Sequence, residues 1–74
     1  MNKNEAVYKA VTEISQETYI DRKSILDQYS YPMDGFKLAK RLQFYGKVTD
    51  IKLHEIAELG KIDKLVEKYS KGTS

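Results

Sequence analysis

Apolar side chains recur at helical spacing in the first part of the chain. Val7, Val11 and Ile14 fall at positions i, i+4 and i+7, which places them on one face of a helix. Asn4 suits the N-cap position, because its side chain can accept a hydrogen bond from a backbone N–H of the first turn. The pattern predicts a helix over residues 5–17.

A short second helix is predicted over residues 22–29. Asp21 suits its N-cap position. Ile20 and Ile25 have the spacing of a hydrophobic staple, in which an apolar side chain before the cap packs against one in the second turn. This pair would fix the direction in which the chain enters the helix.

A third helix is predicted over residues 32–45. Proline suits the first turn of a helix, and the residue before it avoids helical geometry, so Tyr31-Pro32 marks the start. Gly46 is expected to end the helix in a left-handed conformation. The positions assigned to the core face are Phe36, Ala39, Leu42 and Tyr45, with Leu38 beside them.

The last predicted helix covers residues 50–69. Thr49 suits its N-cap position, and Val48 and Leu53 have staple spacing. Gly60 interrupts the pattern, because glycine weakens a helix interior. It could divide the segment into two helices or allow a neighbouring helix to approach closely, but we favour a single continuous helix.

The expected fold class is all-α, with about four helices in one domain over residues 1–74. Residues 70–74 are expected to form a frayed tail. Hydrophobic residues make up 41% of the chain and charged residues 32%, a balance typical of globular proteins rather than disordered ones. Apolar runs are too short for a signal peptide or a membrane span, so we expect no membrane partner and a cytoplasmic location.

Several classes of chemistry find no support in the sequence. The absence of cysteine excludes disulfides and thiolate metal sites. The four glycines are too dispersed for a phosphate-binding loop. The single histidine, His54, is interpreted as a solvated helix residue. We therefore expect a non-enzyme with no cofactor and no metal site.

Positive charge is concentrated in the middle of the chain. The net charge of the whole protein is +2, whereas residues 21–47 carry six basic and three acidic groups. On the helix predicted over 32–45, an outward face carries three cations and one aromatic ring, which is the composition of a binding hot spot. These residues are Lys37, Lys40, Arg41 and Phe44. Alternatively, Phe44 packs under the following loop and the cations only aid solubility.

Four further residues complete the candidate binding set: Lys47, Arg22, Lys23 and Tyr31. Arg22 and Lys23 occupy the first turn of a predicted helix, where the helix dipole disfavours cations, so an anion is expected nearby. Tyrosine is favoured at interfaces and also at the edges of small cores. We assign Tyr8, Tyr19 and Tyr31 to interfaces, and Tyr29, Tyr45 and Tyr69 to core edges.

The first functional hypothesis is a small non-catalytic interaction protein. Such a protein would bind a larger protein or nucleoprotein and regulate or inhibit it by covering part of its surface. Short single-domain chains of this composition are frequent among phage and mobile-element inhibitors of host machinery, which is a compositional analogy only. A homodimer is left open.

The second hypothesis is a DNA-binding helix-turn-helix protein. The helices predicted over 22–29 and 32–45 would flank a short turn at Ser30-Tyr31, with the second as recognition helix. The side chains entering a major groove would be Lys37, Lys40, Arg41 and Gln43. The missing turn glycine, the acidic Asp34 near the helix start and the low net charge weigh against this hypothesis.

Overall fold

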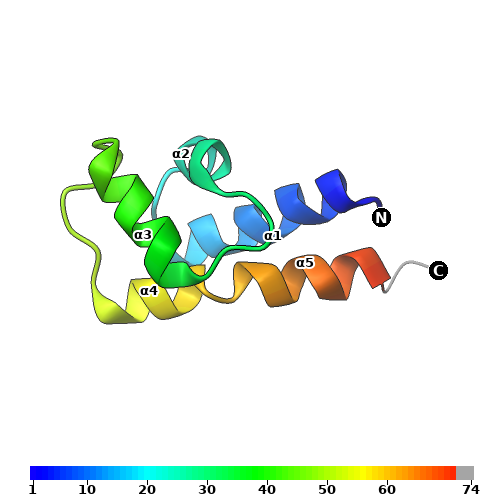
Figure 1. Ribbon diagram of the computed structural model, residues 1–74. Coiled ribbons are helices and arrows are strands. Elements are labelled where there is room, and N and C mark those ends of the chain that lie inside the picture. Colours follow the sequence, from blue (N-terminus) through cyan, green and yellow to red (C-terminus); the bar gives the residue numbers. More distant parts are fainter. Residues whose placement is uncertain (72–74) are drawn as a thin grey trace.

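A computed structural model describes residues 1–71 of the chain. The helices are α1 (Lys3–Thr18), α2 (Arg22–Gln28), α3 (Gly35–Phe44), α4 (Leu53–Leu59) and α5 (Ile62–Lys71). The predicted all-α fold class is confirmed. In Figure 1, α1 and α5 lie side by side and antiparallel; α2 packs against α1, and α3 packs against α2 and α4. None of these helices is long and apolar enough to cross a membrane.

Hydrogen bonds at the helix starts explain where α1 and α2 begin. The Asn2 side chain accepts a bond from the Glu5 backbone N–H at 2.8 Å, and the Glu5 carboxylate accepts one from the Asn2 N–H at 3.2 Å. This reciprocal cap starts α1 earlier than predicted, so the assignment of Asn4 as the cap is wrong. Asp21 caps α2 as predicted, accepting from the Ser24 N–H at 3.0 Å.

The start of α3 differs from the prediction. Residues 29–34 form a connection instead of a helical turn, and the Tyr31–Pro32 peptide is cis. The Met33 N–H donates to the Asp63 carboxylate on α5, at 3.1 and 3.0 Å to its two oxygens, so it is not used inside a helix. Asp34 is the N-cap and accepts from the Lys37 N–H at 2.7 Å.

The buried face of α3 is narrower than the predicted one. Its buried residues follow helical spacing: Gly35, Leu38, Ala39 and Leu42. Ala39 and Leu42 therefore lie in the core as predicted, but the assignment of Phe36 and Tyr45 to the core is wrong. The side chain of Phe36 is 58% exposed and that of Tyr45 is 55% exposed.

A close backbone contact between α3 and the α4–α5 junction lies at the centre of this buried face. A Cβ atom added to Gly35 would lie 2.3 Å from the carbonyl oxygen of Ile56 and 2.6 Å from the backbone N of Gly60. Only glycine fits at such a distance. The start of α3 is thus pressed against the junction, and Phe36, the next residue, turns to solvent.

The last predicted helix is divided in two, so the prediction of one continuous helix is wrong. α4 ends at Leu59, and α5 begins at Ile62 after a turn that contains Gly60. The start of α3 also lies close to Gly60, which is the close helix approach named above as an alternative. Leu53 is 84% exposed, so the predicted staple is wrong as well. The N-cap of α4 is Lys52 rather than Thr49.

The C-terminal part of α5 extends beyond the predicted helix end. Ser70 and Lys71 belong to α5 and not to a tail. The other residues of the predicted tail, 72–74, lie outside the described residues.

One core cluster joins the helices. Small and branched side chains of α1 face α5, and the α2–α3 end adds Ile25, Leu38 and Leu42. Ile20 and Ile25 are both buried here, as expected of the predicted staple across the start of α2. The α1 and α5 members of the cluster are Ala6, Ala10, Val11, Ile14, Ile62 and Val66. The alanines let the two long helices approach closely.

Three tyrosine hydroxyls donate to carboxylates at the edge of this core. Tyr29 donates to Asp63, Tyr31 to Glu67 at 3.0 Å, and Tyr69 to Glu13. The first two bonds tie the 29–34 connection to α5, and the third ties α5 to α1. Tyr29 is buried and Tyr69 half-buried, which agrees with their assignment to core edges.

Gly35→Ala is expected to lower the free energy of unfolding by about 2–3 kcal/mol, because two backbones must separate to admit the methyl group. Gly60→Ala is the matched control. Its added Cβ would lie 3.4 Å from the carbonyl oxygen of Ala57, in ordinary van der Waals contact. We expect the control to change the unfolding free energy by less than about 1 kcal/mol in urea titrations followed by circular dichroism. If both variants lowered the free energy of unfolding equally, the close backbone contact at Gly35 would be contradicted.

Gly46→Ala is expected to destabilise the protein by about 1 kcal/mol. Gly46 has φ of 70°, and the Lys47 N–H donates to the Leu42 carbonyl at 2.8 Å in the helix-ending arrangement predicted from the sequence. Nothing lies within 4 Å of an added Cβ, so the loss reflects backbone conformation alone. The same urea titration measures it, and Gly46→Asn should recover part of the loss because asparagine tolerates this conformation.

Stability is expected to fall as pH rises above about 10. Burial, and then the bond to Asp63, raises the pKa of Tyr29 well above its usual 10.0. Hydrogen bonds to carboxylates raise the pKa of Tyr31 and Tyr69 too. As pH rises, these tyrosines lose their hydroxyl protons in the unfolded chain before they do so in the folded protein. High pH therefore favours unfolding. Urea titrations from pH 8 to 11 should show a shallower decline for Tyr29→Phe. Tyr19→Phe, at a side chain 94% exposed, should leave the decline unchanged.

Candidate binding surface on α3

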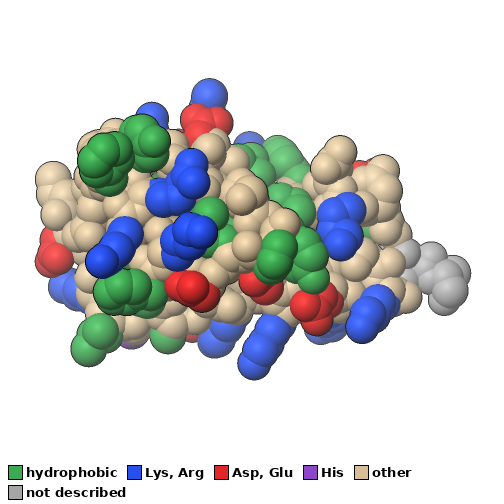
Figure 2. All heavy atoms as spheres, viewed as in Figure 1, with side chains coloured by type: hydrophobic (Ala, Val, Ile, Leu, Met, Phe, Trp, Pro, Cys, Tyr) green, Lys and Arg blue, Asp and Glu red, His purple; other side chains and the backbone are tan. Residues whose placement is uncertain are grey.

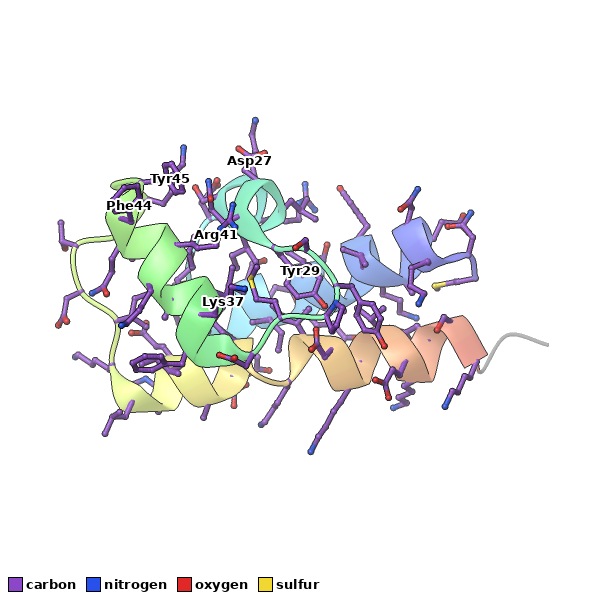
Figure 3. The ribbon with its side chains drawn as sticks, viewed as in Figure 1. Asp27, Tyr29, Lys37, Arg41, Phe44 and Tyr45 are labelled. Atoms are coloured by element: carbon purple, nitrogen blue, oxygen red, sulfur yellow. The ribbon has the colours of Figure 1, made fainter. Side chains whose placement is uncertain are left out.

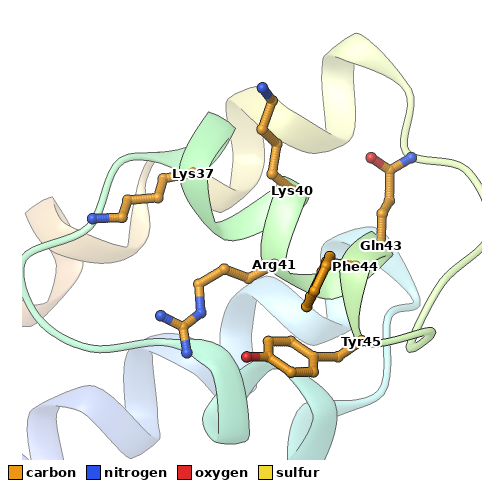
Figure 4. A pocket seen from close by; sticks show the side chains of 6 residues that line it. All are labelled: Lys37, Lys40, Arg41, Gln43, Phe44 and Tyr45. Atoms are coloured by element: carbon orange, nitrogen blue, oxygen red, sulfur yellow. The ribbon is translucent and has the colours of Figure 1, made fainter.

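The side of α3 that faces away from the core presents one continuous set of exposed side chains. Lys37, Arg41 and Phe44 follow one another at i, i+4 and i+7, and Lys40 stands beside them, as predicted. Together with two neighbours they line an open depression, shown in Figure 4. We call this the α3 surface; its residues are Lys37, Lys40, Arg41, Gln43, Phe44 and Tyr45.

Two aromatic rings form the apolar part of the α3 surface. Phe44 is 81% exposed, so the alternative that it packs under the following loop is wrong. Its ring meets the Tyr45 ring edge to face, with centroids 4.9 Å apart and planes at 90°. This is a favoured aromatic arrangement, so each ring limits the movement of the other. Figure 3 shows the pair at the end of α3.

Cations lie over the aromatic rings of α3. The Lys40 ammonium is 4.9 Å from the centroid of the Phe36 ring, and the Arg41 guanidinium is 6.0 Å from that of the Tyr45 ring. In Figure 2, basic side chains gather over α3 between two groups of hydrophobic ones. The contacts hold flexible side chains against rings without neutralising their charge.

No salt bridge within residues 1–71 balances the positive charge of the α3 surface. In the described part of the chain, the salt bridges are Lys23–Asp27 at 3.5 Å and Lys61–Glu58 at 2.8 Å, and neither involves α3. The carboxylate nearest in sequence is Asp34, which caps the helix. Lys37, Lys40 and Arg41 therefore present three positive charges to solvent.

The remaining predicted binding residues are not all part of this surface. Lys47 is exposed just beyond the end of α3, and Lys23 pairs with Asp27 on α2. Arg22 lies over the ring of Tyr8, at 5.0 Å. Tyr31 contacts α5 through Glu67 and lines a second groove between α1 and α2, with Lys3 over its ring at 4.3 Å.

Tyr45 is the member of the α3 surface that the sequence analysis missed. It was assigned to the core because it continues the three-residue spacing of Phe36, Ala39 and Leu42. Gly46 could have corrected the assignment, since a left-handed residue there places Tyr45 at the helix end, where helical spacing no longer decides which side chains are buried.

The short turn that supported the helix-turn-helix hypothesis is absent. α2 ends at Gln28 and α3 begins at Gly35, so residues 29–34 connect them. Such turns ordinarily have three or four residues. This connection is also bound to α5 through Tyr29, Tyr31 and Met33.

Within residues 1–71, no three histidine or carboxylate side chains lie together as they would to hold a metal ion. His54 is exposed on α4, as expected for a solvated residue.

Comparisons of the chain with protein-family models, curated proteins and solved structures found no match. Function is therefore inferred from the α3 surface itself.

Proposed function

We propose that this protein is a small, non-catalytic interaction protein that binds a larger protein through the α3 surface and regulates or inhibits it by covering part of its surface. The observation that carries the proposal is the exposure of Phe44, which packs against Tyr45 on the same surface as three cations that form no salt bridge within residues 1–71.

The side chain of Phe44 is largely exposed to solvent in the free protein. Full burial of a phenylalanine side chain is worth about 1.5–3 kcal/mol, and Phe44 leaves most of this unused. Interfaces are enriched in aromatic residues and arginine, and their hot spots combine such side chains at the centre. The α3 surface has this composition in its Phe44, Tyr45 and Arg41.

A protein partner accounts for the α3 surface better than duplex DNA does. DNA recognition by a helix requires cations that reach phosphates and polar groups that reach bases, but gives little use to an exposed phenylalanine. Asp34 stands at the start of α3, where its carboxylate would face phosphate groups. The long 29–34 connection also departs from the motif that would insert α3 into a groove.

Phe44→Ala is expected to weaken partner binding by more than about 1 kcal/mol, mostly through faster dissociation, while leaving the fold intact. Leu53→Ala is the matched control, because Leu53 is a similarly exposed apolar residue on α4. Immobilised wild-type protein and both variants would be incubated with lysate of the source cells, in parallel with and without nuclease treatment. Proteins retained by the wild type and by Leu53→Ala, but not by Phe44→Ala, would be purified and their affinities measured.

Two results would contradict the proposal. One is a partner whose affinity is unchanged by Phe44→Ala. The other is a bound fraction that disappears with nuclease and whose affinity falls linearly with log salt, by about 0.9 log units per neutralised phosphate. Circular dichroism of each variant confirms that a change in binding does not reflect loss of fold.

A further inference from the structure

The charge on α3 also indicates what kind of protein surface it meets. Resting on the proposed function, we infer that the α3 surface docks onto an acidic segment of the partner, in which carboxylates border an apolar pocket. The carboxylates meet Lys37, Lys40 and Arg41, and the pocket receives Phe44.

The three cations are arranged for carboxylates. Lys37 and Arg41 are one helical turn apart, about 6 Å along the axis, and Lys40 lies between them in sequence. In the described residues none of the three forms a salt bridge that docking would have to break. An acidic partner therefore gains three charge contacts without the loss of any existing ion pair.

Aromatic contacts prepare two of these cations for binding. Lys40 lies over Phe36 and Arg41 over Tyr45 in the free protein. A side chain that is already held against a ring loses less conformational entropy when it pairs with a carboxylate. The planar guanidinium of Arg41 also matches a carboxylate with two parallel hydrogen bonds, which a lysine cannot reproduce.

Phe44 adds a requirement that charge alone does not satisfy. Its ring extends from the helix beside Tyr45 and is open to solvent (Figure 4). An acidic surface without an apolar pocket would leave this ring exposed in the complex. The partner segment must therefore combine carboxylates with aliphatic or aromatic side chains.

A second copy of this chain does not fit the same surface. A symmetric dimer through α3 would place the same patch of each protomer against the other. Lys37, Lys40 and Arg41 of one protomer would then face the same three cations of its partner, with no carboxylate of α3 other than the capping Asp34 to offset them. Like charges brought together in this way disfavour association.

A displayed library of random 16-residue peptides, selected on the immobilised whole chain, tests the inference. Enriched peptides should combine Asp or Glu with Leu, Ile or Phe. The triple variant Lys37→Glu, Lys40→Glu, Arg41→Glu should weaken their binding about 100-fold. Phe44→Ala should weaken it about tenfold.

A second triple variant controls for net charge. Lys52, Lys64 and Lys71 are exposed cations outside α3, and changing all three to glutamate alters the net charge by the same amount. Binding of the enriched peptides to this variant should stay within about threefold of the wild type, because its α3 surface is intact. Circular dichroism confirms the fold of both triple variants.

Different outcomes separate this inference from the proposed function. Peptides that need Phe44 but lack acidic residues, or that tolerate reversal of the α3 charges, would overturn the acidic segment and leave the interaction protein standing. A selection that yields no peptide dependent on α3 would also overturn the inference. Random-sequence 20-base-pair duplex DNA that binds more tightly than any peptide, with no effect of Phe44→Ala, would overturn both.

Discussion

The backbone contact between Gly35 and Gly60 determines how the rest of the molecule is arranged. Because Gly35 lacks a Cβ atom, the start of α3 lies against the backbone of the α4–α5 junction. This contact sets the rotation of α3 about its own axis, with Leu38 and Leu42 buried. The opposite side, which bears Phe44, is left in solvent. The candidate binding surface is thus a consequence of a contact made on the other side of the same helix.

Local signals in the sequence were sufficient to predict the helical segments. Asp21 and Gly46 mark helix ends through side-chain and backbone chemistry that acts within a few residues. The division at Gly60 was not predictable in the same way, because it depends on a contact with Gly35, 25 positions earlier in the chain. The tether from Met33 to Asp63, which delays the start of α3, is equally non-local.

In the candidate site, too, some residues could be predicted from local spacing and others could not. Lys37, Lys40, Arg41 and Phe44 were placed together because helical spacing alone puts them on one side. Tyr45 was missed because α3 ends one residue before it, so helical spacing no longer decides whether its side chain is buried. Arg22 was a candidate because the helix dipole disfavours a cation at its position, and Tyr31 because tyrosine is favoured at interfaces. Arg22 instead contacts α1, and Tyr31 contacts α5.

The pairing of α1 with α5 has a consequence for the way the protein folds and responds to a ligand. The 43 residues from Tyr19 to Lys61 separate these helices, and closing such a loop costs about 3 kcal/mol of chain entropy beyond a constant contribution. A small domain with a single core ordinarily unfolds as one cooperative unit, so the pair and α3 are expected to form together. A ligand bound at α3 would then slow amide hydrogen exchange in α1 and α5 as well, since it stabilises the only state in which they are paired.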